Sequence, residues 1–288
     1  MPAISLDRLN AHRGRTFRLE ASLRLHSQEE AVAFVQERGF VYFWPITGIT
    51  LPSLWTATAG DRPVADAHDD PGHVTWGWKD ALLGQRAWYY GKVLRKRGTM
   101  IALPLLPYFY ALSENYGSPE EDYLTLYEQG LLTLESRTVY EALLTHGPLD
   151  TLALRKAARL SSAESNTRFE KALSDLQADF KIVPMGVAEV GSWRYAFIYN
   201  VTARQYPELP DLAHPIQERP ARLELARAYF HSVGAARPRD VAKLFGWRLP
   251  AVERAIDDLV ESGLLRRGLS LPGQTGEWIA LSELCEEG

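Results

Sequence analysis

The chain has 288 residues, of which 46% are hydrophobic and 24% are charged, and its formal net charge is −4. This composition is that of a globular protein with two or three domains, and no apolar run approaches the ~20 residues that a membrane span needs. The one cysteine, Cys285, excludes a disulfide within the chain and argues against a Cys-based zinc site, and the first residues lack the apolar stretch of a signal peptide. We therefore expect a cytoplasmic protein without a metal or other cofactor and without a membrane partner.

Residues 1–130 predict a decorated, winged-helix-like domain. The hydrophobic pattern and the turn residues indicate, in order, a helix over 28–38, a buried strand over 40–45, a polar loop over 60–72, a short helix over 76–83, two hairpin strands over 87–95 and 99–103, and a helix over 104–115. Residues 118–130 are expected to link this domain to the next.

Aromatic side chains gather in this first domain, where five of the eight tryptophans precede residue 90. An aromatic cleft can stack an unpaired or flipped base, and it can equally hold a small apolar or aromatic ligand. The alternative is that the rings are core, which is the commonest fate of aromatic side chains. The candidate residues for a base or ligand cleft are Tyr42, Trp44, Trp55, Trp76, Trp78 and Trp88.

A basic cluster marks the tip of the predicted hairpin. The negative net charge argues mildly against a nucleic-acid partner, because phosphate contacts supply much of the affinity for DNA. However, residues 1–100 hold 13 Lys and Arg against 10 acidic residues, whereas residues 206–288 hold 10 against 13. The tip residues Lys92, Arg95, Lys96 and Arg97 are predicted to contact the phosphate backbone or a groove, and the alternative is a solvated turn.

Residues 131–205 predict a winged helix-turn-helix. Three helices, over 135–145, 151–159 and 163–178, precede two strands, over 180–185 and 193–199, which are joined by a turn at 189–192. In a helix-turn-helix the start of the third helix faces the major groove. The candidate DNA-binding residues here are Arg155, Lys156, Arg159, Asn166 and Arg168. The alternative is a solvated helix face, which Glu164 and Glu170 favour.

The same order of elements repeats in residues 206–288. A proline-rich linker over 207–220 precedes helices over 222–232, 238–245 and 250–261, and then strands over 264–269 and 278–281. Acidic residues follow the basic ones here, so Arg237, Arg239 and Lys243 are expected to serve packing or dimerisation. The predicted fold class is thus mainly α with small β-hairpins (α+β), built from tandem winged helix-turn-helix units with domains over 1–130, 131–205 and 206–288.

Few residues offer acid–base chemistry. His68, Asp69, Asp70 and His73 lie in a loop without the i, i+4 spacing of a helical metal site, so a polar turn is favoured over a metal site. No phosphate-binding glycine loop or hydrolase motif is present in the sequence. The candidate catalytic residues near the aromatic cluster are Asp69, Asp70 and Asp80.

Three segments resemble the AlkZ/YcaQ family of bacterial DNA glycosylases: residues 38–46 (RGFVYFWPI), 54–57 (LWTA) and 97–103 (RGTMIAL). The resemblance implies tandem winged helices and removal of alkylated or crosslinked bases from DNA. The family's catalytic motif, Gln-x-Gln or Gln-x-Asp, falls on residues 42–44, which are Tyr42, Phe43 and Trp44. Neither outer residue can activate water as a carboxylate or an amide would.

Three functions follow from these observations. The first is a repair-related protein that binds double-stranded or damaged DNA, with catalysis either lost or moved to an acidic residue; if active, it would be a DNA glycosylase. The second is a non-enzymatic regulator that binds DNA. The third is a small-molecule-binding protein that uses the aromatic cleft, with the winged helices as its scaffold. The chain is expected to be a monomer or a homodimer.

Overall fold

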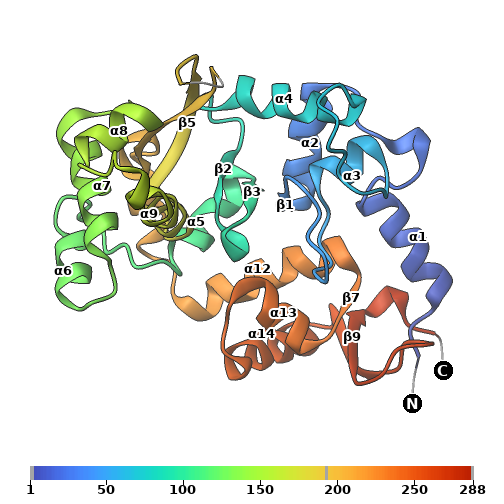
Figure 1. The fold of residues 1–288 in the computed structure, drawn as a ribbon. Coiled ribbons are helices and arrows are strands. Elements are labelled where there is room, and N and C mark those ends of the chain that lie inside the picture. Colours follow the sequence, from blue (N-terminus) through green and yellow to red (C-terminus); the bar gives the residue numbers. More distant parts are fainter. Residues whose placement is uncertain (1–2, 192–193, 287–288) are drawn as a thin grey trace. The chain divides into compact units, whose positions relative to one another are not determined.

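The computed structural model describes residues 3–191 and 194–286 (Figure 1). The chain forms two compact units, which we describe one at a time. The first unit comprises residues 1–78, 100–105 and 218–288, and the second comprises residues 79–99 and 106–217. The division of the chain into three sequential domains remains a prediction.

The second unit contains a three-helix, three-strand assembly. Its elements are α7 (Leu134–His146), β4 (Leu149–Asp150), α8 (Thr151–Ala157), α9 (Asn166–Ala178), β5 (Ile182–Ala188) and β6 (Ala196–Val201). The strands form an antiparallel sheet in the order β4-β6-β5, with Val183 opposite Asn200. The core between the helices and this sheet includes the fully buried side chains of Leu143, Leu154 and Phe169. This is the arrangement of a winged helix, and it agrees with the predicted fold class.

Local signals explain where these helices begin. The Thr133 hydroxyl accepts a hydrogen bond from Ser136 N at the start of α7, and an Asp150 oxygen accepts from Leu152 N and Ala153 N at the start of α8. The predicted turn residue Ser192 and strand residue Trp193 lie outside the described residues. The described part of the second strand, β6, begins three residues later than predicted and ends two residues later.

The first unit contains the same order of elements in its C-terminal segment. These are α12 (Glu218–Val233), β7 (Ala235–Ala236), α13 (Pro238–Phe245), α14 (Leu249–Glu261), β8 (Leu265–Leu269) and β9 (Trp278–Leu281). The sheet order β7-β9-β8 matches that of the second unit, because a two-residue strand between the first two helices again pairs with the last strand (Figure 1). The fold class predicted from the sequence is therefore confirmed as helical with small antiparallel sheets.

The N-terminal elements of the first unit pack around this segment. They are α1 (Leu6–Thr16), α2 (Gln28–Arg38), β1 (Phe40–Tyr42), α3 (Leu54–Ala59) and the start of α4 (Val74–Leu82). No helix was expected at α1 from the sequence. This helix lies against α12, where Arg13 Nε donates to Val233 O at 2.9 Å. Gly39 has a positive φ of 79° and directly follows α2, as expected for a glycine that ends a helix.

The second unit also holds shorter elements, and three of them correct the predictions. They are the last turn of α4, β2 (Tyr89–Lys92), α5 (Leu106–Tyr110), α6 (Asp122–Glu128), α10 (Thr202–Gln205) and α11 (Leu209–Ala213). The strand β3 (Gly98–Ile101) crosses the division between the units. The helix predicted over 104–115 ends at Tyr110, because Ser113 and Asn115 form local hydrogen bonds that compete with a helix. The predicted links at 118–130 and 207–220 contain α6 and α11.

The link predicted over 207–220 is too long partly because α12 begins inside it. Pro220 lies in its first turn, where a missing N–H does no harm, so α12 begins at Glu218 instead of near residue 222. Among the described helices, none combines the length and the apolar character that a membrane crossing requires.

Acid is expected to destabilise the first unit through two histidines, the buried His12 and the exposed His231. Burial lowers the pKa of both His12 and His231, while a hydrogen bond from His12 Nε2 to His231 O opposes this effect at His12. As the pH falls through 6.5, these histidines bind protons in the unfolded chain but stay neutral in the folded chain, so the free energy of unfolding decreases. The decrease ends once the pH is below the folded pKa values. At the buried His12, each unit of pKa lowering corresponds to about 1.4 kcal/mol. At the exposed His231, solvent screening reduces the effect.

Urea unfolding at two pH values, about 7.5 and 5.5, measures this effect. The wild-type protein should be less stable at the lower pH, and His12→Gln should lose less stability than the wild type between the two. An identical pH dependence of the two proteins would show that His12 does not contribute.

Candidate nucleic-acid interface

The basic hairpin tip of the second unit is a tight turn with exposed cations. Arg95 and Lys96 both have φ near +55°, a left-handed conformation that non-glycine residues adopt infrequently. The turn is held by Leu94 N, which donates to Thr99 Oγ1 at 3.2 Å. The side chains of Arg95, Lys96 and Arg97 are exposed, so the tip presents basic groups on a fixed backbone.

Two of the four predicted hairpin cations fasten the tip to α9. Lys92 Nζ donates to Ser174 Oγ at 3.3 Å, and Lys96 forms an ion pair with Asp175. Burial opposes ionisation of Asp175, but its hydrogen bonds with Lys171 and Lys96 lower the pKa of this carboxyl. Arg95 and Arg97 keep their charge uncompensated, since no acidic partner contacts them in the described part of the chain.

The turn between α8 and α9 uses another predicted residue internally. The Arg155 guanidinium donates to Leu160 O at 3.0 Å and to Ser162 O at 3.3 Å, and it also hydrogen-bonds Asn166 Oδ1. Arg155 and Asn166 therefore close this turn. Lys156 and Arg159 are exposed beside it, again with no acidic partner among the described residues.

The four uncompensated cations, Arg95, Arg97, Lys156 and Arg159, are here called the outer cations. One pair is near the N-terminus of α9, because the α8–α9 turn carries it. The other pair is near the C-terminal half of α9, because the neighbouring Lys96 contacts Asp175. A helix of 13 residues is about 20 Å long, so the two pairs lie toward opposite ends of α9. Between the pairs, Arg168 is compensated by Glu135 at 3.0 Å.

The predicted aromatic cleft residues do not form one open set. Tyr42 and Trp55 are fully buried in the first unit, and Trp78 is nearly so. Trp88 is buried in the second unit, where its carbonyl accepts a hydrogen bond from Tyr206. Trp44 is 37% exposed and Trp76 is half-buried, and these two rings meet edge to face at 5.6 Å. Of the six predicted cleft residues, Trp44 and Trp76 are the two that are accessible enough to contact a base.

The catalytic candidates have structural partners or lie in a loop. Asp70 accepts from Arg62 at 2.6 Å and from Gly72 N at 2.8 Å, and these bonds lower the pKa of its carboxyl. Asp80 pairs with the buried Lys79 at 2.7 Å and accepts from the Tyr195 hydroxyl at 3.0 Å. Asp69 is exposed in the loop before α4. No cluster of three metal-binding side chains occurs among residues 3–191 and 194–286.

Sequence reasoning missed the residues that position the hairpin. Ser174, Asp175 and Gln177 all lie on α9, where Gln177 Oε1 accepts from Lys92 N at 3.1 Å. Their partners are about 80 positions away in the sequence, so no local pattern reveals the pairing. Lys79 was missed as well, because neighbouring residues of a helix do not face each other and the sequence gives no sign of its pairing with Asp80.

Comparison with known proteins identifies relatives of this chain. A model of the family described as "AlkZ related" matches residues 25–246. The solved structure of the Streptomyces sahachiroi DNA glycosylase AlkZ has a similar fold, with a TM-score of 0.57 over 98% of this chain and 71% of that chain, at 15% sequence identity. No curated protein matches this chain. Because the family model covers well over half of the residues, the chain belongs to the AlkZ-related family.

Proposed function

We propose that this protein binds double-stranded DNA through the second unit, with α9 and the outer cations as the contact surface. The observation that carries the proposal is the charge state of Arg95, Arg97, Lys156 and Arg159, which are exposed and uncompensated among the described residues. Cations without acidic partners can neutralise phosphates and release counterions, whereas cations already in ion pairs gain less from doing so. The glycosylase-like fold and the family membership support a role in DNA repair.

We further propose that residues 42–44 do not perform base excision. Tyr42 occupies the first motif position and is fully buried, so water and a sugar cannot reach its hydroxyl. Trp44 occupies the second position, and an indole N–H donates but does not accept a proton from water. The chemistry of hydrolysis needs a group that activates water or stabilises the cationic sugar, and neither residue supplies one.

A gel-shift panel tests both parts. Intact, abasic, alkylated and single-stranded DNA are compared at two salt concentrations, and base release from the alkylated duplex is measured in parallel. We expect duplex binding that weakens as salt rises, without base release. Salt-independent or absent binding would overturn the first part, and base release lost in Tyr42→Phe or Trp44→Phe would overturn the second.

A further inference from the structure

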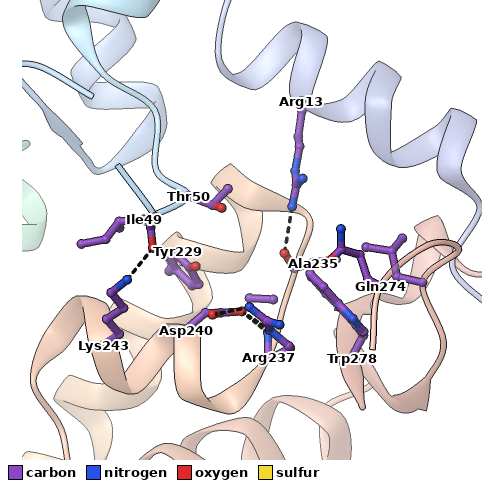
Figure 2. Close-up of a pocket in the computed structure, with 13 residues that line it drawn as sticks. Arg13, Ile49, Thr50, Tyr229, Ala235, Arg237, Asp240, Lys243, Gln274 and Trp278 are labelled. Carbon is purple, nitrogen blue, oxygen red and sulfur yellow. Dashed lines mark hydrogen bonds and ion pairs between the residues drawn. The ribbon is translucent and has the colours of Figure 1, made fainter. Parts of the chain in front are cut away.

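A cavity of about 310 Å³ lies within the first unit, whereas the residues assigned above to DNA binding belong to the second unit (Figure 2). Its walls come from α1, the loop after β1, the end of α12, β7, α13 and the segment around β9. This volume lies at the lower end of the range for small-molecule sites, about 300–1,000 Å³. The cavity therefore suits one small ligand.

The cavity walls are positively charged. Arg13, Arg237 and Lys243 line the cavity together with a single carboxylate, Asp240. Arg237 is compensated, because its Nε and Nη2 bond the two Asp240 oxygens at 2.8 and 2.9 Å. In Figure 2, Arg13 reaches from α1 toward the side of the cavity where Asp240, Arg237 and Lys243 lie.

The other two cations are held by backbone carbonyls. Arg13 Nη2 donates to Ala235 O at 3.1 Å, and Lys243 Nζ donates to Gly48 O at 2.8 Å. A carbonyl fixes the position of a cation without cancelling its charge. Burial also lowers the pKa of Arg13, which reflects the cost of keeping this charge away from water. An anion in the cavity would offset that cost.

A neutral donor in the same wall lacks an acceptor. Trp278 is only 8% exposed, and its indole N–H has no hydrogen-bond partner among the described residues. Leaving a buried N–H without an acceptor is unfavourable, because the group has lost its water and gained no partner. The amide of Gln274 lines the cavity as well and can donate to the same ligand.

We propose that this cavity binds a phosphomonoester, with Arg13 and Lys243 contacting the phosphate and the Trp278 N–H donating to it or to the attached group. A phosphomonoester carries about −1.5 to −2 charges at neutral pH and offers several strong acceptor oxygens, which matches two uncompensated cations and an unused donor. The phosphate can come from a free mononucleotide or from the 5′ end of a DNA strand.

Calorimetry on the full chain at low salt tests the proposal, with thymidine 5′-monophosphate as the probe. We expect saturable binding that is at least about tenfold weaker for thymidine, which lacks the phosphate. Lys243→Gln should weaken probe binding about tenfold and Lys243→Arg should restore most of it, since a hydrogen bond to a charged group is the stronger kind. Trp278→Phe, which keeps the ring and removes the N–H, should weaken binding about threefold.

Arg239→Gln is the matched control, because Arg239 is exposed on the same helix but does not line the cavity. It should change probe binding less than about twofold, and thermal unfolding confirms that each variant is folded. A 5′-phosphorylated oligonucleotide that competes with the probe better than its unphosphorylated form would identify a DNA end as the source, whereas competition by mononucleotides alone would identify a free ligand.

Absence of saturable probe binding, equal binding of thymidine, or equal effects of Lys243→Gln and Arg239→Gln would each overturn the proposal. Arg95→Ala with Arg97→Ala should leave probe binding unchanged. The proposal of a phosphomonoester site and the proposal of a duplex interface can therefore be disproved independently of each other.

Discussion

Replacing Arg95 and Arg97 together with alanine is expected to weaken binding to duplex DNA by at least about tenfold at ~50 mM salt. Each lost phosphate contact removes close to one released counterion, so the slope of log affinity against log salt should fall by about 1.8 for the pair. Alanine keeps the Cβ atom at residue 95, so the left-handed turn is not relaxed by the change, and Lys96 can still pair with Asp175. Lys156→Ala with Arg159→Ala should give a similar loss. Fluorescence anisotropy over a salt series measures both quantities.

The matched control removes two arginines from the same unit whose charges are already compensated. Arg86 pairs with Glu208, and Arg137 pairs with Glu141 at 2.8 Å. Arg86→Ala with Arg137→Ala changes the net charge by the same amount but should alter the slope by less than about 0.5. If the control and the outer-cation variants lose affinity equally, the protein responds to its overall charge, and α9 does not define the interface.

The tandem winged helices could be predicted from the sequence because their signals are local. Apolar spacing along α9, the Asp150 side chain before α8 and Pro238 at the start of α13 each lie within one turn of the element that they specify. The strands β4 and β7 were missed because they are two residues long and exist only through pairing with β6 and β9. Pairing over such distances in sequence leaves no periodic pattern.

The sequence could predict which basic residues belong to the candidate interface, but not which of them are free of partners in the described part of the fold. The sequence identified all four hairpin cations, yet it could not separate Arg95 and Arg97 from Lys92 and Lys96, whose partners lie on α9. The cavity of the first unit could not be predicted from the sequence, since Arg13 and Lys243 are 230 positions apart and come to line one cavity only through packing. Arg237 and Lys243 were expected to serve packing or dimerisation, and the structure places both on the wall of that cavity.

For the aromatic residues, too, the sequence could not predict the role, because composition does not distinguish rings that line a cleft from rings that form the core. Trp55 is fully buried, and its Nε1 donates to Arg62 O at 3.1 Å. Its ring also packs against His73 at 5.2 Å, and a Cβ placed on Gly72 would lie only 2.9 Å from it. Trp44, eleven positions earlier, is 37% exposed. These two tryptophans therefore allow a direct test of which rings are structural.

Trp55→Ala is expected to lower the free energy of unfolding by about 3–5 kcal/mol, because it removes a large buried side chain and leaves the Arg62 carbonyl without its donor. Trp44→Ala should cost no more than about 1 kcal/mol, since more than a third of that side chain already faces solvent. Equilibrium urea unfolding of both variants measures the difference, and hydrogen exchange locates the loss to the first unit. A Trp55→Ala protein as stable as Trp44→Ala would mean that Trp55 lines an open cleft, and the third function considered from the sequence would then gain support.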